Sequence, residues 1–169
     1  MTSYLVLTVI ADDKPGLVES LAAVITENSG NWLESSMSQL AGKFAGILKI
    51  SVGDSHLDQL ELALEALGGL KLVIERVKTD ETLGGPITVE LNLMANDRPG
   101  IIREISRAVA DLSVNVEKLT TSCSSAPMSG VDLFKATATL KVPPSLELSK
   151  LREELESLAD DMIVEIDAS

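Results

Sequence analysis

The sequence IADDKPGL at residues 10–17 returns as MANDRPGI at residues 94–101. The two copies lie 84 residues apart, which is close to half of the 169 residues of the chain. The alignment runs on without a gap to Ser36 and Thr120. A repeat that divides the chain in this way predicts two copies of one supersecondary unit, so both halves should hold the same order of elements.

The second half carries an insertion, and a linker joins the halves. Phe44 aligns with Phe134, so the offset grows from 84 to 90 and about six extra residues fall near 124–130. Between the halves, a polar segment with two glycines and a proline is typical of a linker. We therefore expect a first domain at 1–80, a linker at 81–86 and a second domain at 87–169.

Hydrophobic periodicity predicts the same six elements in each half. Apolar, β-branched runs indicate strands, and apolar residues spaced three and four apart indicate helices. In the first half the expected strands are 4–10, 32–40, 44–52 and 70–77, and the expected helices follow Pro15 and span 57–67. In the second half the expected strands are 87–94, 115–122, 131–142 and 162–166, with helices at 99–112 and 148–158.

This order of elements predicts the fold class. Strand–helix–strand–strand–helix–strand, occurring twice, predicts an α+β protein of two tandem ferredoxin-like βαββαβ domains. Each domain is then an antiparallel sheet with both helices on one face. One sheet face and the strand edges stay uncovered, so we expect a homo-oligomer in which copies cover some of that surface.

The composition excludes several classes of function. The chain has 14 basic and 26 acidic residues, a net charge of -12 and four aromatic residues, so direct nucleic-acid binding is not expected. The single cysteine and single histidine favour neither a disulfide nor a metal site. No uncharged run approaches the roughly 18 residues of a membrane span, and residues 1–4 do not resemble a signal peptide. We expect a cytoplasmic protein without a cofactor.

The repeated Asp-(Lys/Arg)-Pro-Gly joins the first strand of each half to its first helix. One interpretation is structural, with the proline in the first helical turn and the aspartate near the cap. It explains Gly16 and Gly100 less well, because glycine inside a helix costs about 1 kcal/mol relative to alanine. The other interpretation is a ligand site, where the glycine admits a small molecule and free N–H groups attract its carboxylate. From the residues alone both interpretations stay open.

Asn31 and Asn115 occupy equivalent positions where the second strand of each half begins. An Asn amide can accept a hydrogen bond from an ammonium group and donate one to a carboxylate. The structural alternative is a turn Asn in the left-handed conformation.

The insertion is the feature that breaks the symmetry of the two halves. Residues 122–130 have the Ser, Pro and Gly content of a flexible loop, which can contact a partner, a ligand or the other half. The alternative is a tolerated surface insertion. We expect Cys123, close to this loop, to be a small packing residue rather than a nucleophile, because no basic partner is evident.

The sequence DRPGI at 97–101, between a strand and a helix, resembles the corresponding segment of the ACT domain, a regulatory fold that senses amino acids. DKPGL at 13–17 resembles it with Lys14 in place of the usual arginine. The resemblance covers essentially the whole chain as a tandem pair. The loop SAPMSG at 125–130, followed by Leu133 and Phe134, resembles the second-domain loop of the glycine cleavage system transcriptional repressor family, which are free-standing tandem ACT proteins.

The resemblance implies a non-enzymatic regulatory protein that binds glycine or a similar small amino acid and restrains a transcriptional activator by direct contact. The ligand-binding candidates it implies are Asp13, Lys14, Pro15, Gly16, Leu17, Asn31, Asp97, Arg98, Pro99, Gly100, Ile101 and Asn115. The candidate partner or ligand loop is Ser125, Ala126, Pro127, Met128, Ser129 and Gly130. The competing hypothesis is a stand-alone regulatory or assembly subunit of an amino-acid metabolic enzyme.

The sequence gives no positive support for catalysis. It contains no Ser-centred nucleophile elbow, no P-loop and no zinc-ligand spacing. The adjacent acidic pairs 12–13 and 160–161 do not form acid/base dyads, because sequence neighbours do not face each other. We therefore expect that the protein is not an enzyme and has no catalytic residues.

Overall fold

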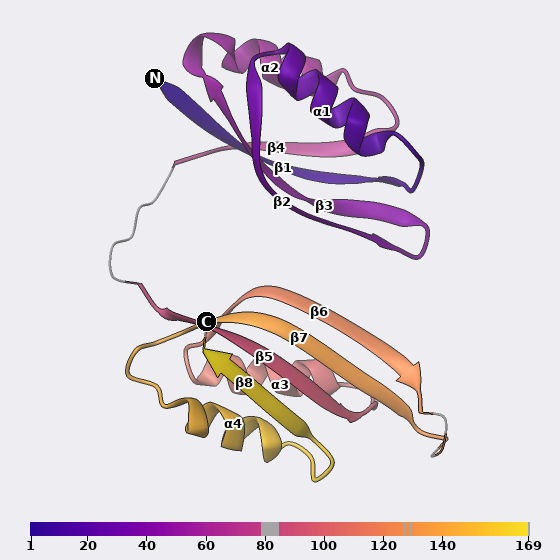
Figure 1. Cartoon of the computed structure of the whole chain (residues 1–169), viewed down its shortest axis with the longest axis vertical. Coiled ribbons are helices and arrows are strands. Elements are labelled where there is room, and N and C mark those ends of the chain that lie inside the picture. The colour runs from indigo at the N-terminus through magenta and orange to yellow at the C-terminus, as the bar shows by residue number, and fades with distance from the viewer. Residues whose placement is uncertain (79–84, 127, 129, 169) are drawn as a thin grey trace. The chain divides into compact units, whose positions relative to one another are not determined.

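The computed structural model describes residues 1–78, 85–126, 128 and 130–168. Contacts divide the chain into two compact units, Met1–Glu81 (unit 1) and Thr82–Ser169 (unit 2). Most of the predicted linker, residues 81–84, lies outside the described residues, so the exact domain limits stay a prediction. Each unit is described by itself below (Figure 1).

Unit 1 is a four-stranded antiparallel sheet with two helices. Its strands occur in the order β2-β3-β1-β4, and its elements are β1 (Thr2–Asp12), α1 (Leu17–Glu27), β2 (Gly30–Leu40), β3 (Lys43–Gly53), the short 3-10 helix η1 (Asp54–His56), α2 (Leu57–Glu65) and β4 (Leu70–Val77).

Unit 2 repeats this arrangement with the strand order β6-β7-β5-β8. Its elements are β5 (Ile87–Asn96), α3 (Ile101–Asp111), β6 (Asn115–Ser125), β7 (Asp132–Val142), α4 (Leu148–Glu156) and β8 (Ile163–Ala168). The predicted fold class, two tandem βαββαβ units, is confirmed.

Strand register confirms the alignment of the halves. Ala11 pairs with Phe44 in unit 1, and Ala95 pairs with Phe134 in unit 2, at the offsets of 84 and 90 that the sequence predicts. The extra residues lie in the second hairpin, where Ser125 pairs with Asp132. Its counterpart in unit 1 is a two-residue turn at Ala41 and Gly42, both with positive φ, as a type I′ hairpin requires.

Each core lies between one face of the sheet and the two helices, which cover that face only (Figure 1). Alternation along β1 turns Leu5, Leu7 and Val9 toward the helices, which contribute Leu21, Ile25, Leu60 and Leu64 in unit 1. The same pattern buries Leu91 and Leu93 against α3 and α4 in unit 2. The opposite face of each sheet carries no helix, and we call it the open face.

The starts of two helices differ from the expectation. The helices α1 and α3 begin at Leu17 and Ile101, after the Pro-Gly pair, so neither proline lies in the first helical turn as predicted. Ser29, and not Gly30, takes the left-handed conformation after α1. Gly30 is required by space, because a Cβ there would lie 2.8 Å from Cγ2 of Ile25.

The predicted loop at 122–130 is shorter in the structure. Residues 122–125 belong to β6 and pair with β7, because the inserted residues extend the ladder before the chain turns. The loop is closed by the Ala126 N–H, which donates to the carbonyl of Val131 at 3.3 Å. Pro127 and Ser129 lie outside the described residues.

Candidate functional site

The strand-to-helix junction of each unit is built around a glycine in the left-handed conformation. Gly16 has φ 89° and Gly100 has φ 85°, and each is the N-cap residue of its helix. A positive φ of this size strains any residue with a Cβ, which gives these glycines a conformational reason. A Cβ at either position would meet no atom within 4 Å, so the space beside each glycine is open.

The first helical turn at each junction has backbone N–H groups for which no acceptor is found among the described residues. No side chain caps α1 or α3. Among the described residues, no acceptor is found for the N–H groups of Leu17, Val18 and Glu19, since the first bond of α1 runs from Ser20 N to Gly16 O at 2.9 Å. In unit 2 the Ile101 N–H is already used by the carbonyl of Arg98 at 3.3 Å. A carboxylate would find free donors and the positive end of the helix dipole at both places.

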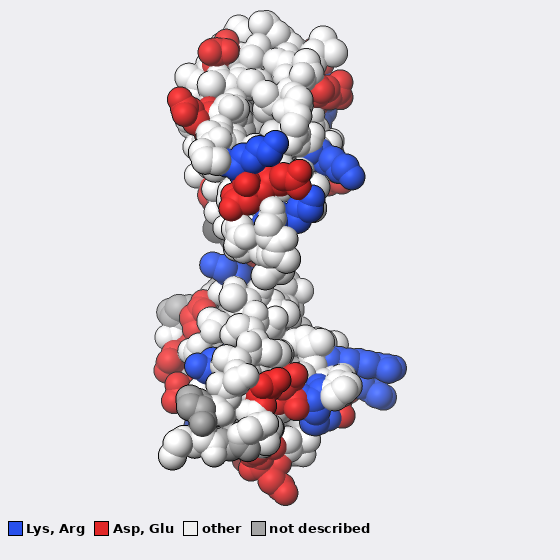
Figure 2. All heavy atoms as spheres, turned by 90° about the vertical axis from the view of Figure 1, so that its right-hand side faces the viewer, with Lys and Arg blue, Asp and Glu red and all other residues white. Residues whose placement is uncertain are grey.

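The junction of unit 1 borders a hollow of about 230 Å³. Its lining residues are Asp13, Lys14, Gly16, Leu17, Val18, Glu19 and Phe44. Next to it, Lys43 forms an ion pair with Asp12 and lowers the pKa of that carboxyl through a hydrogen bond and its charge. Figure 2 shows basic and acidic side chains intermixed on the surface it displays, rather than separated by sign.

The junction of unit 2 is hydrogen-bonded to the connection between α4 and β8. Arg98 pairs with Glu104 and also donates to the carbonyl of Leu158 at 3.3 Å. The hydrogen bond and charge of Arg98 lower the pKa of Glu104, and Glu104 raises the pKa of Arg98. The Asn96 N–H donates to Oδ2 of Asp161 at 2.6 Å. These bonds fix Arg98, whereas no hydrogen bond or ion pair is found for the Lys14 side chain within the described residues.

The role of Asp161 was not predicted from the sequence. The signal was available, because the acidic pair at 160–161 has no counterpart in the first half, where two glycines follow the second helix.

The two predicted asparagines lie at the other end of each unit from the junctions. Asn31 pairs with Ser51, which pairs with Tyr4 near the start of β1, whereas the junction follows the end of β1 at Asp12. Eight residues of strand between Tyr4 and Asp12 span about 26 Å. Asn115 has the same position in unit 2, opposite Lys141. The asparagine and the junction of one unit therefore lie apart, and neither asparagine has positive φ as a turn Asn would.

Cys123 is exposed on β6, so the expected packing role is wrong. Desolvation of the sulfur is the main cause that raises its pKa, and the neighbouring Asp97 raises it further. The side chain therefore stays a protonated thiol at neutral pH, which agrees with the expectation that it is not an activated nucleophile. The loop beside it is held by Ser125, whose hydroxyl donates to Oδ1 of Asp132 at 3.1 Å.

The described residues contain no buried polar or charged side chain. They also contain no group of three or more His, Cys, Asp or Glu residues placed to hold a metal ion. No helix among them is long and apolar enough to cross a membrane.

Family comparisons match both units. A model of the ACT domain matches residues 3–71, and a second ACT-domain model matches residues 83–164. A UPF0237 protein of Methanococcus maripaludis is 31% identical over 75 residues, which cover 41% of this chain and 83% of the relative. A UPF0237 protein of Methanocaldococcus jannaschii is 32% identical over 72 residues, which cover 39% and 80%.

Two solved structures share the full architecture. A protein of unknown function from Galdieria sulphuraria superposes with a TM-score of 0.87 at 24% identity, covering 100% of this chain and 99% of the other. A protein named "putative glycine cleavage system transcriptional repressor" superposes with a TM-score of 0.72 at 20% identity, also covering 100% and 99%. At these identities the likeness demonstrates a common tandem fold.

Proposed function

The chain belongs to the ACT-domain family, and from that premise we propose that it is a non-enzymatic regulatory protein that responds to a small amino acid. Glycine or an amino acid of similar size is the proposed ligand, and a protein partner receives the signal. The mechanism is linkage: the amino acid changes affinity for the partner by some factor, and the partner must change affinity for the amino acid by the same factor.

The observation that carries this proposal is the pair of junctions. Each presents a left-handed glycine, open space beside it and unused N–H groups in the first turn of a helix. A carboxylate can bind such donors. The free ammonium group of Lys14 adds a positive charge in unit 1, whereas the charge of Arg98 is shared with Glu104 in unit 2. We therefore propose that unit 1 has the stronger carboxylate site of the two.

We propose a DNA-binding transcription factor as the partner, acting in the cytoplasm. The tandem fold shared with the protein named as a glycine cleavage system repressor supports this choice. The net charge of -12 suits a partner with a basic patch and disfavours direct contact with DNA. Capture from the native lysate, with and without glycine, tests it. Recovery of a biosynthetic enzyme in place of a regulator would favour the role of a metabolic enzyme subunit.

A non-enzymatic role agrees with the electrostatics of the described residues. Among the described residues, the carboxyl groups of Asp12, Glu61 and Glu104 have pKa values lowered by ion pairs at the surface. Acid–base catalysis at neutral pH generally uses groups whose pKa is shifted toward 7 by burial. The lowered pKa values of these three carboxyl groups lie further from 7 than the ordinary values do.

We also propose that copies associate through the open face of unit 1. Ile10, Ile47 and Val73 are exposed there to 44%, 56% and 56%. They project from three neighbouring strands, because Thr8 pairs with both Ile47 and Val73, and Ile10 lies two residues further along β1. Burying these exposed apolar side chains is favourable in water.

The test of amino-acid binding is thermal unfolding of the full chain with each of the twenty amino acids at millimolar concentration. A ligand present at ten times its Kd stabilises the folded state by about 1.4 kcal/mol, which raises Tm by several degrees. We expect glycine, or another amino acid with a small side chain, to produce this shift. A panel that leaves Tm unchanged would remove the sensor proposal.

Two variants then locate the site without breaking the fold. Asn tolerates the left-handed conformation, so Gly16→Asn and Gly100→Asn should fold while placing an amide side chain beside the free N–H groups. We expect Gly16→Asn to weaken binding at least tenfold in calorimetry. Gly69→Asn is the matched control, since Gly69 has φ 85° and equally open surroundings. Equal affinity in all three variants would exclude the junctions as the site.

A further inference from the structure

The open face of unit 2 has a polar centre. Six side chains lie on it in two rows across strands β7, β5 and β8: Lys135, Met94 and Ile163 in the first row, and Thr137, Asn92 and Glu165 in the second. They share a face because β5 alternates, with Leu91, Leu93 and Ala95 buried toward the helices. The two rows are adjacent along the strands.

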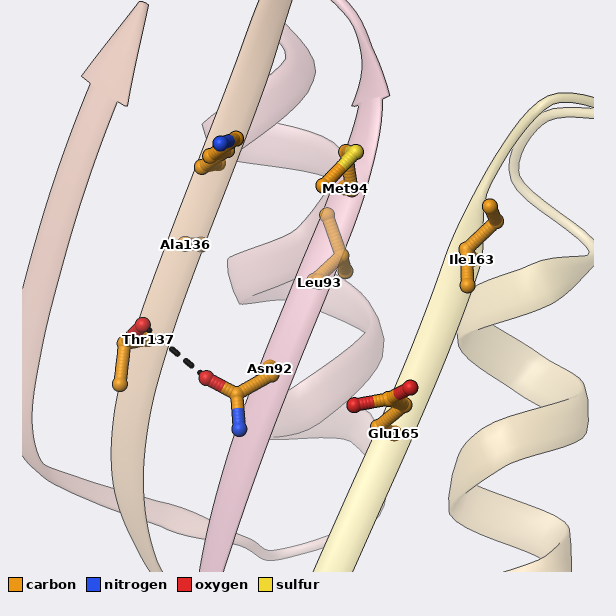
Figure 3. Close-up of a pocket in the computed structure, with 8 residues that line it drawn as sticks. Asn92, Leu93, Met94, Ala136, Thr137, Ile163 and Glu165 are labelled. Atoms are coloured by element: carbon orange, nitrogen blue, oxygen red, sulfur yellow. Dashed lines mark hydrogen bonds between the residues drawn. The ribbon is translucent and has the colours of Figure 1, made fainter.

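These residues line a hollow of about 190 Å³, together with Leu93 and Ala136 at its floor. Figure 3 shows Asn92 and Met94 on the central strand, between Thr137 on one side and Glu165 and Ile163 on the other. The carboxylate of Glu165 extends toward the central strand. Volume on this scale accommodates a molecule of a few heavy atoms.

Two opposite charges at this hollow have no partner within the described residues. No ion pair or hydrogen bond is found there for the Lys135 ammonium or the Glu165 carboxylate. Other charges on the same face are engaged, since Glu90 accepts from Thr139 at 2.8 Å and Lys141 donates to Thr88 at 2.5 Å. The free pair is therefore a local feature of the hollow.

The Asn92 amide between them is held in one orientation. The hydroxyl of Thr137 donates to Oδ1 of Asn92 at 3.1 Å, as the dashed line in Figure 3 marks. The Nδ2 group of Asn92 is then left with its two donors. Met94 and Ile163, exposed to 37% and 61%, provide apolar surface along the other row.

From this arrangement we propose that the open face of unit 2 binds the zwitterion of an α-amino acid with a small apolar side chain. The ligand carboxylate accepts a hydrogen bond from Lys135, its ammonium group donates to Glu165, and its side chain lies on Met94 and Ile163. A simple anion is repelled by Glu165, and a simple cation is repelled by Lys135, so only a molecule with both charges satisfies the pair.

The spacing of the two charges agrees with this ligand. Lys135 and Glu165 are separated by two strand spacings and one step of two residues, so their Cα atoms lie about 12 Å apart. An α-amino acid has its charges about 3 Å apart, and two hydrogen bonds of about 2.8 Å extend its reach to about 9 Å. The long side chains of Lys135 and Glu165 span the remainder.

Unit 1 lacks this site. The residues in the positions of Lys135 and Glu165 are Ala45 and Val73, which have no charge. The inference rests on the proposed response to an amino acid and adds a binding site distinct from the junctions.

The experiment is calorimetry of the full chain with L-alanine as the probe, followed by two-dimensional NMR to map the shifted amides. We expect Lys135→Met and Glu165→Gln each to weaken alanine binding at least tenfold. N-acetylalanine, which has no ammonium group, and alaninamide, which has no carboxylate, should also bind at least tenfold more weakly. Lys118→Met is the matched control, since Lys118 lies on the edge strand β6 outside the hollow.

If a single variant disturbs the sheet, the double charge swap Lys135→Glu with Glu165→Lys still tests the proposed site. A swapped pair accepts the zwitterion in the reverse direction, so it should recover at least part of the affinity that either single swap removes. Alanine binding that is unchanged in these variants but lost in Gly16→Asn or Gly100→Asn would overturn the open-face site and leave the proposed function intact. If no amino acid binds the full chain, both the open-face site and the proposed function are overturned.

Discussion

The open faces of the two units carry different chemistry on the same scaffold. At three equivalent register positions unit 1 has Ile47, Thr8 and Val73, and unit 2 has Thr137, Asn92 and Glu165. The residues that alternate with them face the helices and are apolar in both units. Burial restricts the helix-facing positions to apolar side chains, whereas the open face tolerates either kind.

This difference teaches that the duplication preserved the core and left one surface of each unit able to change. An apolar open face favours contact with protein, and a polar one with unpaired charges favours a small charged molecule. The open faces of the two units therefore have different proposed roles, with self-association assigned to that of unit 1 and a zwitterion site to that of unit 2. Three sets of experiments test this difference between the units.

The largest effect is expected from the cores, which should be independent. Leu60 on α2 and Leu151 on α4 are equivalent and both fully buried. Truncation of either to alanine should cost about 2–5 kcal/mol through lost burial and the cavity left behind. Leu60→Ala should lower the unfolding transition of unit 1 alone, and Leu151→Ala that of unit 2 alone. Hydrogen exchange resolved by residue measures both.

The exposed Leu62 gives the control for this pair. It is 67% exposed on the same helix as Leu60, so Leu62→Ala should change stability by about 0.5 kcal/mol or less. If either core variant destabilised both units equally, the units would form a single cooperative structure and could not be compared as separate parts.

The next effect tests the apolar open face of unit 1. Val73→Glu gives unit 1 the residue that unit 2 has at the same position. A charge in a buried apolar contact is costly, so we expect the dissociation constant of the oligomer to rise at least tenfold, about 1.4 kcal/mol. Sedimentation velocity over a concentration series measures it.

The matched pair Ile47→Glu and Thr137→Glu separates the two faces. These residues occupy equivalent positions on β3 and β7 and are both exposed. Only the change in unit 1 should reduce self-association. A chain that is monomeric at every concentration, or that dissociates equally with both variants, would show that the open face of unit 1 is not the contact.

The fold was predictable because two periodicities are strong in this sequence. Period-two alternation marked the strands, spacing of three and four marked the helices, and the repeat supplied a second copy of each signal. The helix starts were not predictable. Pro followed by Gly fits both a first helical turn and a left-handed N-cap, and only backbone geometry separates the two.

The candidate site was predicted only in part, because its residues were grouped by their positions in the repeat and not by where the strands and helices place them. The junction glycines have the open surroundings that a ligand needs. Asn31 lies far from the junction of its unit, because α1 separates them. This helix of 11 residues carries the chain about 16 Å back along the sheet before β2 begins. Lys135 and Glu165 were missed because neither belongs to a motif, and their proximity depends on the pairing of β7 and β8 with β5.

The smallest effect concerns the ion pairs that flank the two junctions. In unit 1 the Lys43 hydrogen bond and charge hold the pKa of Asp12 below its ordinary 3.8. Because the folded pKa is the lower one, the pair adds stability above the unfolded pKa and loses it as pH falls through the folded value. Lys43→Met should therefore reduce Tm slightly at pH 7 and have no effect at pH 2. Lys71→Met is the control, since Lys71 does not contribute to the shift of Asp12.

The equivalent change in unit 2 should do more than shift one carboxyl group. Arg98→Met should raise the pKa of Glu104 toward its ordinary 4.5, which carboxyl NMR titration measures. It also removes the bond to the Leu158 carbonyl, so amide shifts between α4 and β8 should change, whereas Lys43→Met should leave the end of α2 unaffected. Equal responses at both helix ends would mean that Arg98 does not tie its junction to α4, and the proposed stronger carboxylate site in unit 1 would lose its structural reason.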